Sequence, residues 1–199
     1  MKKYSSILAV ALMTGLWAVP ASAVEQYVSG NVGMTWTNDI KGGSSSYVLD
    51  SGTNVLVALG ADEKHLDYRF EGEIGYQTSG INSFGSSAYR GDVHVFSLLA
   101  NGYYDIYTGE VFKPYVTAGA GAVLVKFNDL RDVGQVSGYS EHETAFAYQV
   151  GVGVTVPVTP DMKFDARCRY FSTADFRMDN GNMTHFSSTS LLIGLRFRL

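Results

Sequence analysis

The sequence has very little cysteine, little proline and no surplus of positive charge. Cys168 is the only cysteine among 199 residues, so the chain can form neither an internal disulfide nor a cysteine-rich metal cluster. Lys and Arg number 15 against 19 Asp and Glu. Because nucleic-acid binding depends on excess positive charge to neutralise phosphates, this balance argues against a nucleic-acid partner.

Glycine and aromatic residues are abundant instead. The chain contains 22 Gly, 13 Tyr and 11 Phe but only 4 Pro, a mixture that favours strands and turns over helices. After residue 23 no apolar run is long enough to cross a membrane as a helix. The length allows one domain, and no linker or low-complexity tract divides residues 24–199.

The N-terminus has the pattern of a cleaved secretory signal peptide. Its parts are a positive start, an apolar run and a small-x-small cleavage signature: Lys2-Lys3, Ile7–Val19, and Ala21 with Ala23. The apolar run is too short for a membrane-spanning helix. We therefore expect cleavage after Ala23, giving a signal peptide over residues 1–23 and a mature domain over 24–199. No cysteine lies at the cleavage point, so we expect no lipid anchor.

The mature chain alternates apolar and polar residues with a period of two, which is typical of strands with one apolar face. The pattern predicts eight strands, at about Tyr27–Trp36, Thr53–Ala61, Leu66–Gln77, Asp92–Tyr104, Tyr115–Phe127, Phe146–Val156, Lys163–Tyr170 and Ser190–Leu199. The fourth is apolar on both faces, and for it we expect an outer face of Phe96, Leu98, Ala100, Gly102 and Tyr104.

The connections between these strands alternate in length. Three are short, at residues 62–65, 105–111 and 157–162. Four are long and rich in Ser, Gly, Asn and Asp, at residues 38–51, 78–90, 128–143 and 173–185. Short turns at one rim and long loops at the other are typical of outer-membrane barrels. The fold class predicted is therefore all-β, an eight-stranded antiparallel up-and-down transmembrane β-barrel.

Alternation alone does not distinguish a lipid-facing apolar surface from a buried core, since a soluble β-sandwich or lipocalin-like barrel has the same period. Strand length and the asymmetry of the loops favour lipid. Aromatic residues near the strand ends resemble the two interfacial girdles of membrane barrels. These are Tyr27, Trp36, Tyr76, Tyr103, Tyr104, Tyr107, Phe112, Tyr115, Phe127, Phe146, Tyr170 and Phe186.

Several segments resemble the small outer-membrane β-barrel superfamily, which includes the opacity-type surface proteins and the barrel domain of outer membrane protein A. They are Asn101–Asp105 with Lys113–Gly121, Arg169–Phe171 and Gly194–Leu199. The resemblance covers the mature chain and implies a Gram-negative outer-membrane location. It also implies a C-terminal signal for the barrel-assembly machinery, formed here by Leu195, Phe197 and Leu199. The chain ends in leucine where the family usually has an aromatic residue.

Charged residues alternate along the third and seventh predicted strands. Strands four apart in a barrel of eight face each other, and the lumen is only wide enough for side chains to fill. Buried charges must be paired. We therefore expect ion pairs to plug the lumen: Asp67 with Lys163, Arg69 with Asp165, Glu71 with Arg167, and Glu73 with Arg169. The alternative is that barrel shear shifts the levels and these groups pair with adjacent strands or water.

Residues that could support catalysis or metal binding are few. His185 and Ser187 form a His-x-Ser pair that resembles an outer-membrane deacylase arrangement, but no acid follows Asp179 to orient the histidine. Glu141–Glu143 is interpreted as a solvated loop, because neighbouring residues in an extended segment point apart. Cys168 is expected on the lipid face. We therefore predict a protein that is not an enzyme and has no cofactor or metal site.

The predicted function is that of a surface protein whose long loops form an antigenic or adhesive face on a barrel anchor. The expected partners are outer-membrane lipid, the assembly machinery and a host or environmental ligand, with the chain acting as a monomer. A structural barrel that supports envelope integrity, a narrow low-conductance channel and, more distantly, a lipid-modifying enzyme are the alternatives.

Overall fold

The computed structural model describes residues 24–38, 40–42, 45–63, 67–84, 87–106, 111–132, 139–177 and 183–199. The predicted signal peptide, including Ala21 and Ala23, lies outside them. Strand β1 begins at Val24, the residue expected to start the mature chain. Within the described ranges, no helix is both long and apolar enough to span a membrane.

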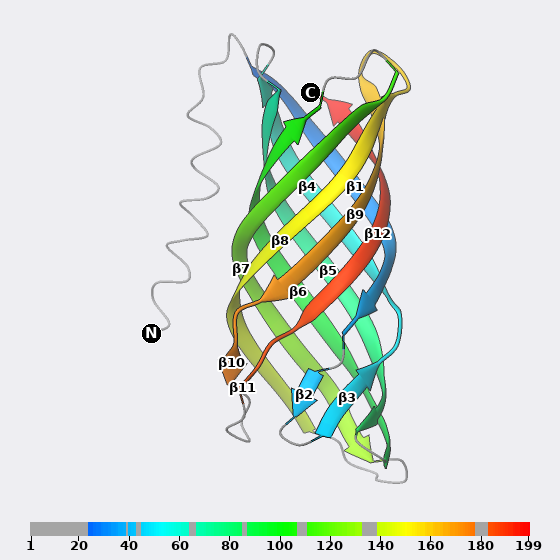
Figure 1. Cartoon of the computed structure of the whole chain (residues 1–199), viewed down its shortest axis with the longest axis vertical. Coiled ribbons are helices and arrows are strands. Elements are labelled where there is room, and N and C mark those ends of the chain that lie inside the picture. The colour runs from blue at the N-terminus through cyan, green and yellow to red at the C-terminus, as the bar shows by residue number, and fades with distance from the viewer. Residues whose placement is uncertain are drawn as a thin grey trace.

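Eight long strands form the wall of the molecule (Figure 1). They are β1 (Val24–Thr37), β4 (Gly52–Glu63), β5 (Tyr68–Phe84), β6 (Ser87–Asp105), β7 (Lys113–Asp132), β8 (Tyr139–Pro157), β9 (Met162–Thr173) and β12 (Ser187–Arg198). Four short strands lie at one end: β2 (Ile40–Gly42), β3 (Ser45–Leu49), β10 (Phe176–Arg177) and β11 (Met183–Thr184).

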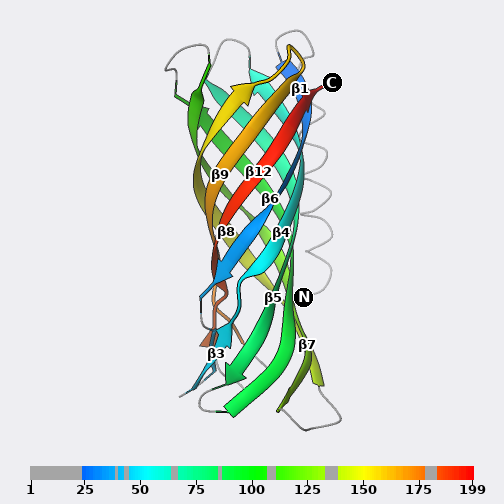
Figure 2. The same cartoon turned by 90° about the vertical axis from the view of Figure 1, so that its right-hand side faces the viewer.

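The eight long strands close into an antiparallel up-and-down barrel. Each pairs with its neighbour in the order β1, β4, β5, β6, β7, β8, β9, β12, and the last pairs with the first, with Val32 opposite Ile193. The strands tilt around a common axis in both views (Figures 1 and 2). The predicted fold class is confirmed.

Side-chain alternation divides the barrel into an apolar outside and a mixed inside. On β4, Val55, Val57 and Leu59 are 43 to 57% exposed, whereas Asn54 and Leu56, which alternate with them, are only 1% exposed. This follows from strand geometry, since successive side chains point to opposite faces. The outer face expected for the fourth predicted strand, now β6, is the one observed: Phe96 and Tyr104 are exposed, and Leu99 is buried.

The two apolar faces of β6 have separate physical causes. Its outer face belongs to the apolar surface of the barrel. Its inner residues Val93, Val95 and Leu99 are buried. The paired strand β7 contributes Val123 and Val125, which are also buried. Part of the lumen is thus filled by aliphatic side chains, which stabilise the barrel by removing apolar area from water.

Two of the predicted long loops are mostly strand. The expected loops at 78–90 and 128–143 are occupied by the continuing ends of β5 and β6, and of β7 and β8. Cross-strand pairs such as Gly80 with Asp92 satisfy the backbone groups of this Ser- and Gly-rich sequence. The prediction of loops was therefore wrong for the described residues 78–84, 87–90, 128–132 and 139–143.

The two ends of the barrel therefore differ. We call the end with the turns β4–β5, β6–β7 and β8–β9 the short-turn end; it also holds the start of β1 and the end of β12. The opposite end is the long-loop end. There β2 pairs with β3, and β3 extends the sheet along β5 with Tyr47 opposite Phe84.

Candidate functional site

The lumen contains a cluster of buried ionised side chains. Its members are Arg69, Glu71 and Glu73 of β5, Asp165, Arg167 and Arg169 of β9, and Arg196 of β12, each no more than 6% exposed. All seven occupy inward positions of the two-residue alternation. Buried charges persist only where counter-charges and hydrogen bonds compensate the loss of water, so the partners of each group determine whether the lumen is sealed.

Glu71 is held by two tyrosines and an arginine. Tyr27 donates a hydrogen bond to Oε1 at 2.7 Å and Tyr103 donates one to Oε2 at 2.6 Å. Arg69 Nη1 lies 3.7 Å from Oε1. Because β1, β5 and β6 each supply one of these groups, the carboxylate links non-adjacent parts of the wall.

Glu73 is shared by two arginines. Arg167 Nη2 donates to Oε2 at 3.2 Å, and Arg169 Nη1 lies 3.6 Å from Oε1. Gln149 of β8 adds a long hydrogen bond at 3.4 Å. Arg167 also donates to the Tyr103 hydroxyl at 2.7 Å, which joins the Glu73 group to the Glu71 group.

Asp165 and Arg69 find their partners nearer the short-turn end. Asp165 accepts hydrogen bonds from Tyr115 at 2.9 Å and Thr155 at 3.2 Å, and Arg196 lies 3.8 Å away. Arg69 Nε donates to both oxygens of Asp105 at 3.0 Å. The four buried arginines thus face the four carboxylates of Glu71, Glu73, Asp165 and Asp105, so their charges balance.

Only one of the four expected cross-lumen pairs is present, Glu73 with Arg169. Arg167 contacts Glu73 instead of Glu71. Asp165 and Arg69 contact Arg196 and Asp105, which lie on neighbouring strands. The strands are staggered in a barrel, and this shear moves opposite residues off the levels assumed from a simple count.

The expected pair of Asp67 and Lys163 is also absent. Asp67 is exposed at the turn before β5. Lys163 is partly exposed at the short-turn rim, where its Nζ lies 3.8 Å from Asp62 of β4. Both residues lie too close to the rim to face each other across the lumen.

From the ionic groups toward the long-loop end, the lumen is lined first by polar, uncharged side chains and then by aromatic ones. Asn54 donates to Ser190 at 3.1 Å and Ser188 donates to Gln77 at 3.2 Å, crossing between β4, β5 and β12. Toward the long-loop end, the buried rings of Phe171 and Phe186 lie 6.3 Å apart at an edge-to-face angle. Side chains therefore fill the lumen at successive levels.

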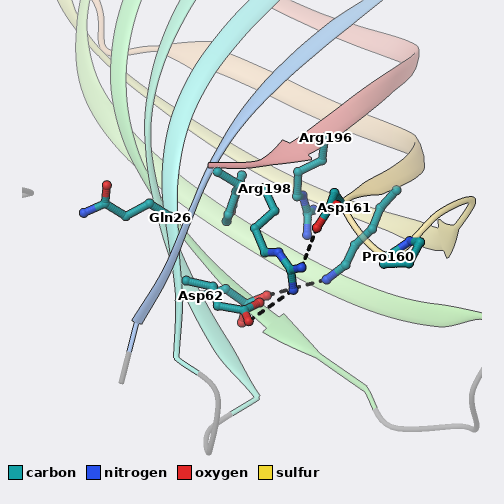
Figure 3. A pocket seen from close by; sticks show the side chains of 9 residues that line it. Gln26, Asp62, Pro160, Asp161, Arg196 and Arg198 are labelled. Carbon is teal, nitrogen blue, oxygen red and sulfur yellow. Dashed lines mark hydrogen bonds and ion pairs between the residues drawn. The ribbon is translucent and has the colours of Figure 1, made fainter. Parts of the chain in front are cut away.

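A small cavity of about 160 Å³ opens at the short-turn end (Figure 3). Three acids and three bases line it: Glu25, Asp62, Asp161, Lys163, Arg196 and Arg198. Arg198 contacts Glu25 at 3.5 Å and also pairs with Asp161 of the β8–β9 turn. The wall of this cavity has equal numbers of both charges, and its ion pairs connect β12 to β1 and to the neighbouring turn.

Several aromatic residues were assigned wrongly to the interfacial girdles. Tyr27, Tyr103, Tyr115 and Phe186 are at most 4% exposed and point into the barrel. Trp36, Tyr76, Tyr104, Phe112, Phe146 and Tyr170 are on the outside, 37 to 60% exposed. The alternation of side chains along each strand, which the sequence provides, would have placed Tyr27, Tyr103 and Tyr115 on the inward face, where their hydroxyls donate hydrogen bonds. Tyr107 lies outside the described residues.

The candidate catalytic residues do not form an exposed nucleophile. Asp175 Oδ1 lies 3.7 Å from His185 Nδ1. An acid is therefore near the histidine, although it precedes His185 in the sequence and does not follow it. His185 is exposed, however, whereas Ser187 is buried and its hydroxyl accepts a hydrogen bond from Asn38 at 2.9 Å. The serine is thus engaged inside the barrel.

The remaining candidate residues are separated. Glu141–Glu143 belongs to strand β8, not to a loop. Across the described ranges, no three His, Cys, Asp or Glu residues are grouped so as to hold a metal ion. Cys168 lies on the outer face of β9, as expected. Leu195, Phe197 and Leu199 also point outward at the end of the chain, 39 to 74% exposed.

One part of the wall extends past the rest at the long-loop end. β5, β6, β7 and β8 contain 17, 19, 20 and 19 residues, whereas β1, β4, β9 and β12 contain only 12 to 14. In both views the extended strands run beyond the ends of β9 and β12 (Figures 1 and 2). We call this extension, residues 79–84, 87–92, 127–132 and 139–145 together with β2 and β3, the projecting sheet.

Comparison with known proteins identifies relatives of the same architecture. A family model described as "outer membrane protein beta-barrel domain" matches residues 8–198. The outer membrane protein PagN of Salmonella typhimurium is 28% identical over 205 residues, covering 86% of this chain and 84% of PagN.

Two further comparisons are more limited. RC1281 of Rickettsia conorii, named as a candidate adhesin, is 29% identical over 121 residues, covering 52% of this chain and 47% of that protein. The crystal structure of Neisserial surface protein A superposes with a TM-score of 0.60 at 19% identity, covering 87% of this chain and 97% of the other. At that identity the likeness concerns the fold alone.

Proposed function

Because the chain belongs to the outer membrane protein β-barrel domain family, and so is an integral protein of the Gram-negative outer membrane, we propose that it is a surface adhesin. Outer-membrane barrels place short turns in the periplasm and long loops outside the cell. On this orientation the barrel is the anchor, and the projecting sheet is the part that contacts another surface. The antigenic or adhesive face expected from the sequence is thus sheet as well as loop.

The observation that carries this proposal is the length of β5 to β8. A tilted strand needs about 9 to 11 residues to cross a bilayer. Strands of 17 to 20 residues therefore leave about 8 residues each beyond the membrane, while β9 and β12, with 12 residues each, leave very few. A hydrogen-bonded sheet loses less conformational entropy on binding than flexible loops do, which favours its use as a contact surface.

The filled lumen and the buried Ser187 argue against the other functions. Paired charges and aromatic rings along the axis leave no evident route for solutes, which disfavours a porin. The hydroxyl of Ser187 is occupied by Asn38 inside the barrel, which disfavours hydrolysis of membrane lipid at this position. We accordingly propose a role without catalysis or a cofactor, and assembly through recognition of Leu195, Phe197 and Leu199. The name of RC1281 agrees with adhesion for the part of the chain that it matches.

Removal of the projecting sheet tests the proposal. Residues 80–92 and 127–141 are each replaced by an Asn-Gly turn, which joins paired strands at the registers Ser79 with Val93 and Lys126 with His142. A non-adherent Gram-negative strain expressing the natural chain should bind epithelial cells or immobilised matrix protein. The shortened chain should lose this binding.

Heat-modifiable gel migration provides the control for assembly, because a closed barrel resists SDS until it is boiled. Loss of binding with intact migration supports the adhesin. Full binding by the shortened chain would exclude the projecting sheet as the adhesive part. If a strain lacking the gene were sensitive to detergent, and the natural and shortened chains restored resistance equally, the alternative of a structural envelope barrel would be favoured.

A further inference from the structure

The cavity at the short-turn end contains two cross-strand pairs of like charge. Arg196 of β12 lies directly opposite Lys163 of β9, which forms a cationic pair. Glu25 of β1 lies directly opposite Asp62 of β4, which forms an acidic pair. All four side chains line the cavity. Because like charges directly opposite each other destabilise a strand pair, each pair requires a group of the other sign close to both of its members.

The counter-charges of the cationic pair are distant. Arg196 Nη2 lies 3.8 Å from Asp165 Oδ2, and Lys163 Nζ lies 3.8 Å from Asp62 Oδ2. A charge-assisted hydrogen bond between such groups spans about 2.7 to 2.9 Å. The third base of the cavity, Arg198, by contrast donates hydrogen bonds to two acids. The cationic pair is therefore the loosely compensated part of the wall.

Arg196 is the buried member of this pair. It is only 5% exposed, and its Nε has no hydrogen-bond acceptor among the described residues. Its guanidinium lies over the Tyr27 ring, 4.7 Å from the ring centre. In Figure 3, Arg196 and Asp62 reach toward the same space from β12 and β4, while Gln26 points away from it. Since a buried donor without an acceptor is costly, this position favours a bound group that accepts hydrogen bonds.

We propose that this cavity binds the α-amino-acid group of a small zwitterionic ligand. The ligand carboxylate lies between Arg196 and Lys163, and its ammonium lies beside Asp62 and Glu25, so each pair of like charges receives a group of the opposite sign. The short turns of outer-membrane barrels face the periplasm, so the ligand is periplasmic. The inference goes beyond adhesion and does not depend on it, because it concerns the opposite end of the barrel.

Charge balance favours a zwitterion over a simple anion or cation. Three acids and three bases line the cavity, and Arg196 is further compensated by Asp165. A phosphate or a polyamine would bring an uncompensated charge into this partly buried site, whereas a zwitterion adds no net charge. The volume of about 160 Å³ has room for one small amino acid, but not for a folded polypeptide.

Two periplasmic sources carry this chemistry. Free amino acids have an ammonium and a carboxylate on one carbon, and so does peptidoglycan whose peptides contain a diamino diacid. Sedimentation of the full mature chain with isolated peptidoglycan sacculi distinguishes them. Sedimentation that is reversed by glycine and absent in Asp62→Asn assigns the site to peptidoglycan, whereas glycine binding without sedimentation assigns it to a free amino acid.

Binding is measured on the full mature chain in nanodiscs, with ¹⁵N-labelled arginine. The Nε–H signal of Arg196 is identified by its loss in Arg196→Lys. Glycine is the probe, and its controls of equal size are propionate, which lacks the ammonium, and glycinamide, which lacks the carboxylate. We expect glycine to shift the Arg196 signal saturably. Propionate and glycinamide should each bind at least about tenfold more weakly, because each loses one charge-assisted contact.

The matched variants remove one charge at a time. Lys163→Met and Asp62→Asn each delete a group that holds the ligand, and both residues are partly exposed, so the barrel should still fold. We expect each variant to weaken glycine binding at least about tenfold. Lys126→Met is the control, since this cation lies by the Phe96 ring on the outer face and should not affect binding. Heat-modifiable migration checks that every variant is assembled.

Three results would overturn the proposal. The first is an Arg196 signal that does not move in up to about 100 mM glycine. The second is equal binding of propionate and glycine, which would indicate a simple anion site. The third is unchanged glycine binding by an assembled Lys163→Met chain, which would show that the cationic pair does not hold the carboxylate.

Discussion

Individual carboxylates organise the interior of this barrel. Glu71, Glu73 and Asp165 each collect three partners from at least two strands. Removing one partner of a buried ionic group leaves another charge without compensation, which costs more than the pair itself contributes. Single substitutions inside the lumen should therefore have large effects, and similar substitutions at the rim should have small ones.

Glu73→Gln tests this at the carboxylate shared by two buried arginines. The substitution leaves Arg167 and Arg169 buried without their shared counter-charge, so we expect a loss of about 3 to 5 kcal/mol in the free energy of unfolding. Urea unfolding in lipid vesicles measures it. Asp161→Asn is the control, because its pair with Arg198 is largely exposed and should contribute less than about 1 kcal/mol. Equal unfolding midpoints for the two variants would contradict the account of the network.

Tyr103→Phe isolates a single hydroxyl. The Tyr103 hydroxyl donates to Glu71 and accepts from Arg167, so its loss should destabilise the barrel by about 1 to 3 kcal/mol. Its neighbour Tyr104 faces outward, and Tyr104→Phe removes a hydroxyl that water can replace. The same unfolding measurement should show a clear difference between these adjacent variants; similar values would mean that the buried hydroxyl is not part of the network.

Between neighbouring strands, tyrosine rings lie over glycines. Tyr27 of β1 is opposite Gly60 of β4, and Tyr115 of β7 is opposite Gly153 of β8. A Cβ added at Gly60 would lie 2.2 Å from the Tyr27 ring, and one at Gly153 would lie 2.4 Å from the Tyr115 ring. These glycines give each ring the space to reach its carboxylate, which links the pairing of two strands to the ionic groups.

Gly153→Ala should consequently displace the Tyr115 ring and break its bond to Asp165. We expect the variant to unfold at a lower urea concentration, by the equivalent of about 1 to 3 kcal/mol. Gly30→Ala on β1 is the matched control, since nothing lies within 4 Å of its added Cβ and alanine is favoured over glycine in a strand. The idea fails if Gly153→Ala is as stable as the Gly30 variant.

For the whole molecule, the filled lumen predicts an absence of general conductance. Charged, amide and aromatic layers follow one another along the axis, and an eight-stranded barrel leaves room for little else. Purified protein in a planar bilayer should give no large, steady single-channel currents in potassium chloride. Such currents, obtained reproducibly from heat-modifiable protein and lost on boiling, would reverse this conclusion and favour the channel.

The lipid-facing outside makes a second prediction at this scale. Ile193, 53% exposed near the middle of β12, lies opposite Val32 of β1. Ile193→Arg should destabilise the protein in bilayers by about 2 to 4 kcal/mol, as a cation does near the bilayer midplane. Thr189→Arg, on the same face nearer the long-loop end, should cost no more than about 1 kcal/mol. Equal costs at both depths would argue that this face does not meet lipid.

The sequence by itself determined the number of long strands, their antiparallel order and which alternate residues of a strand share a face. Strand four, with two apolar faces, was also oriented correctly. Each of these features depends on the alternation of side chains along one strand, which is a local property of the backbone. The same parity placed Glu71, Arg167 and Cys168 on their observed sides.

Only the tertiary structure decided which inward groups meet, how far the strands continue and where the sheet ends. The partners of Arg69 and Asp165 depend on shear, the sum of the registers of all eight strand pairs, and no single strand encodes that sum. The extension of β5 to β8 into Ser- and Gly-rich segments depends on each strand finding a neighbour with which to pair. The pairing of β8 with β9 ends at Ala147, before β8 itself ends, which is a relation between two strands and not a property of either one.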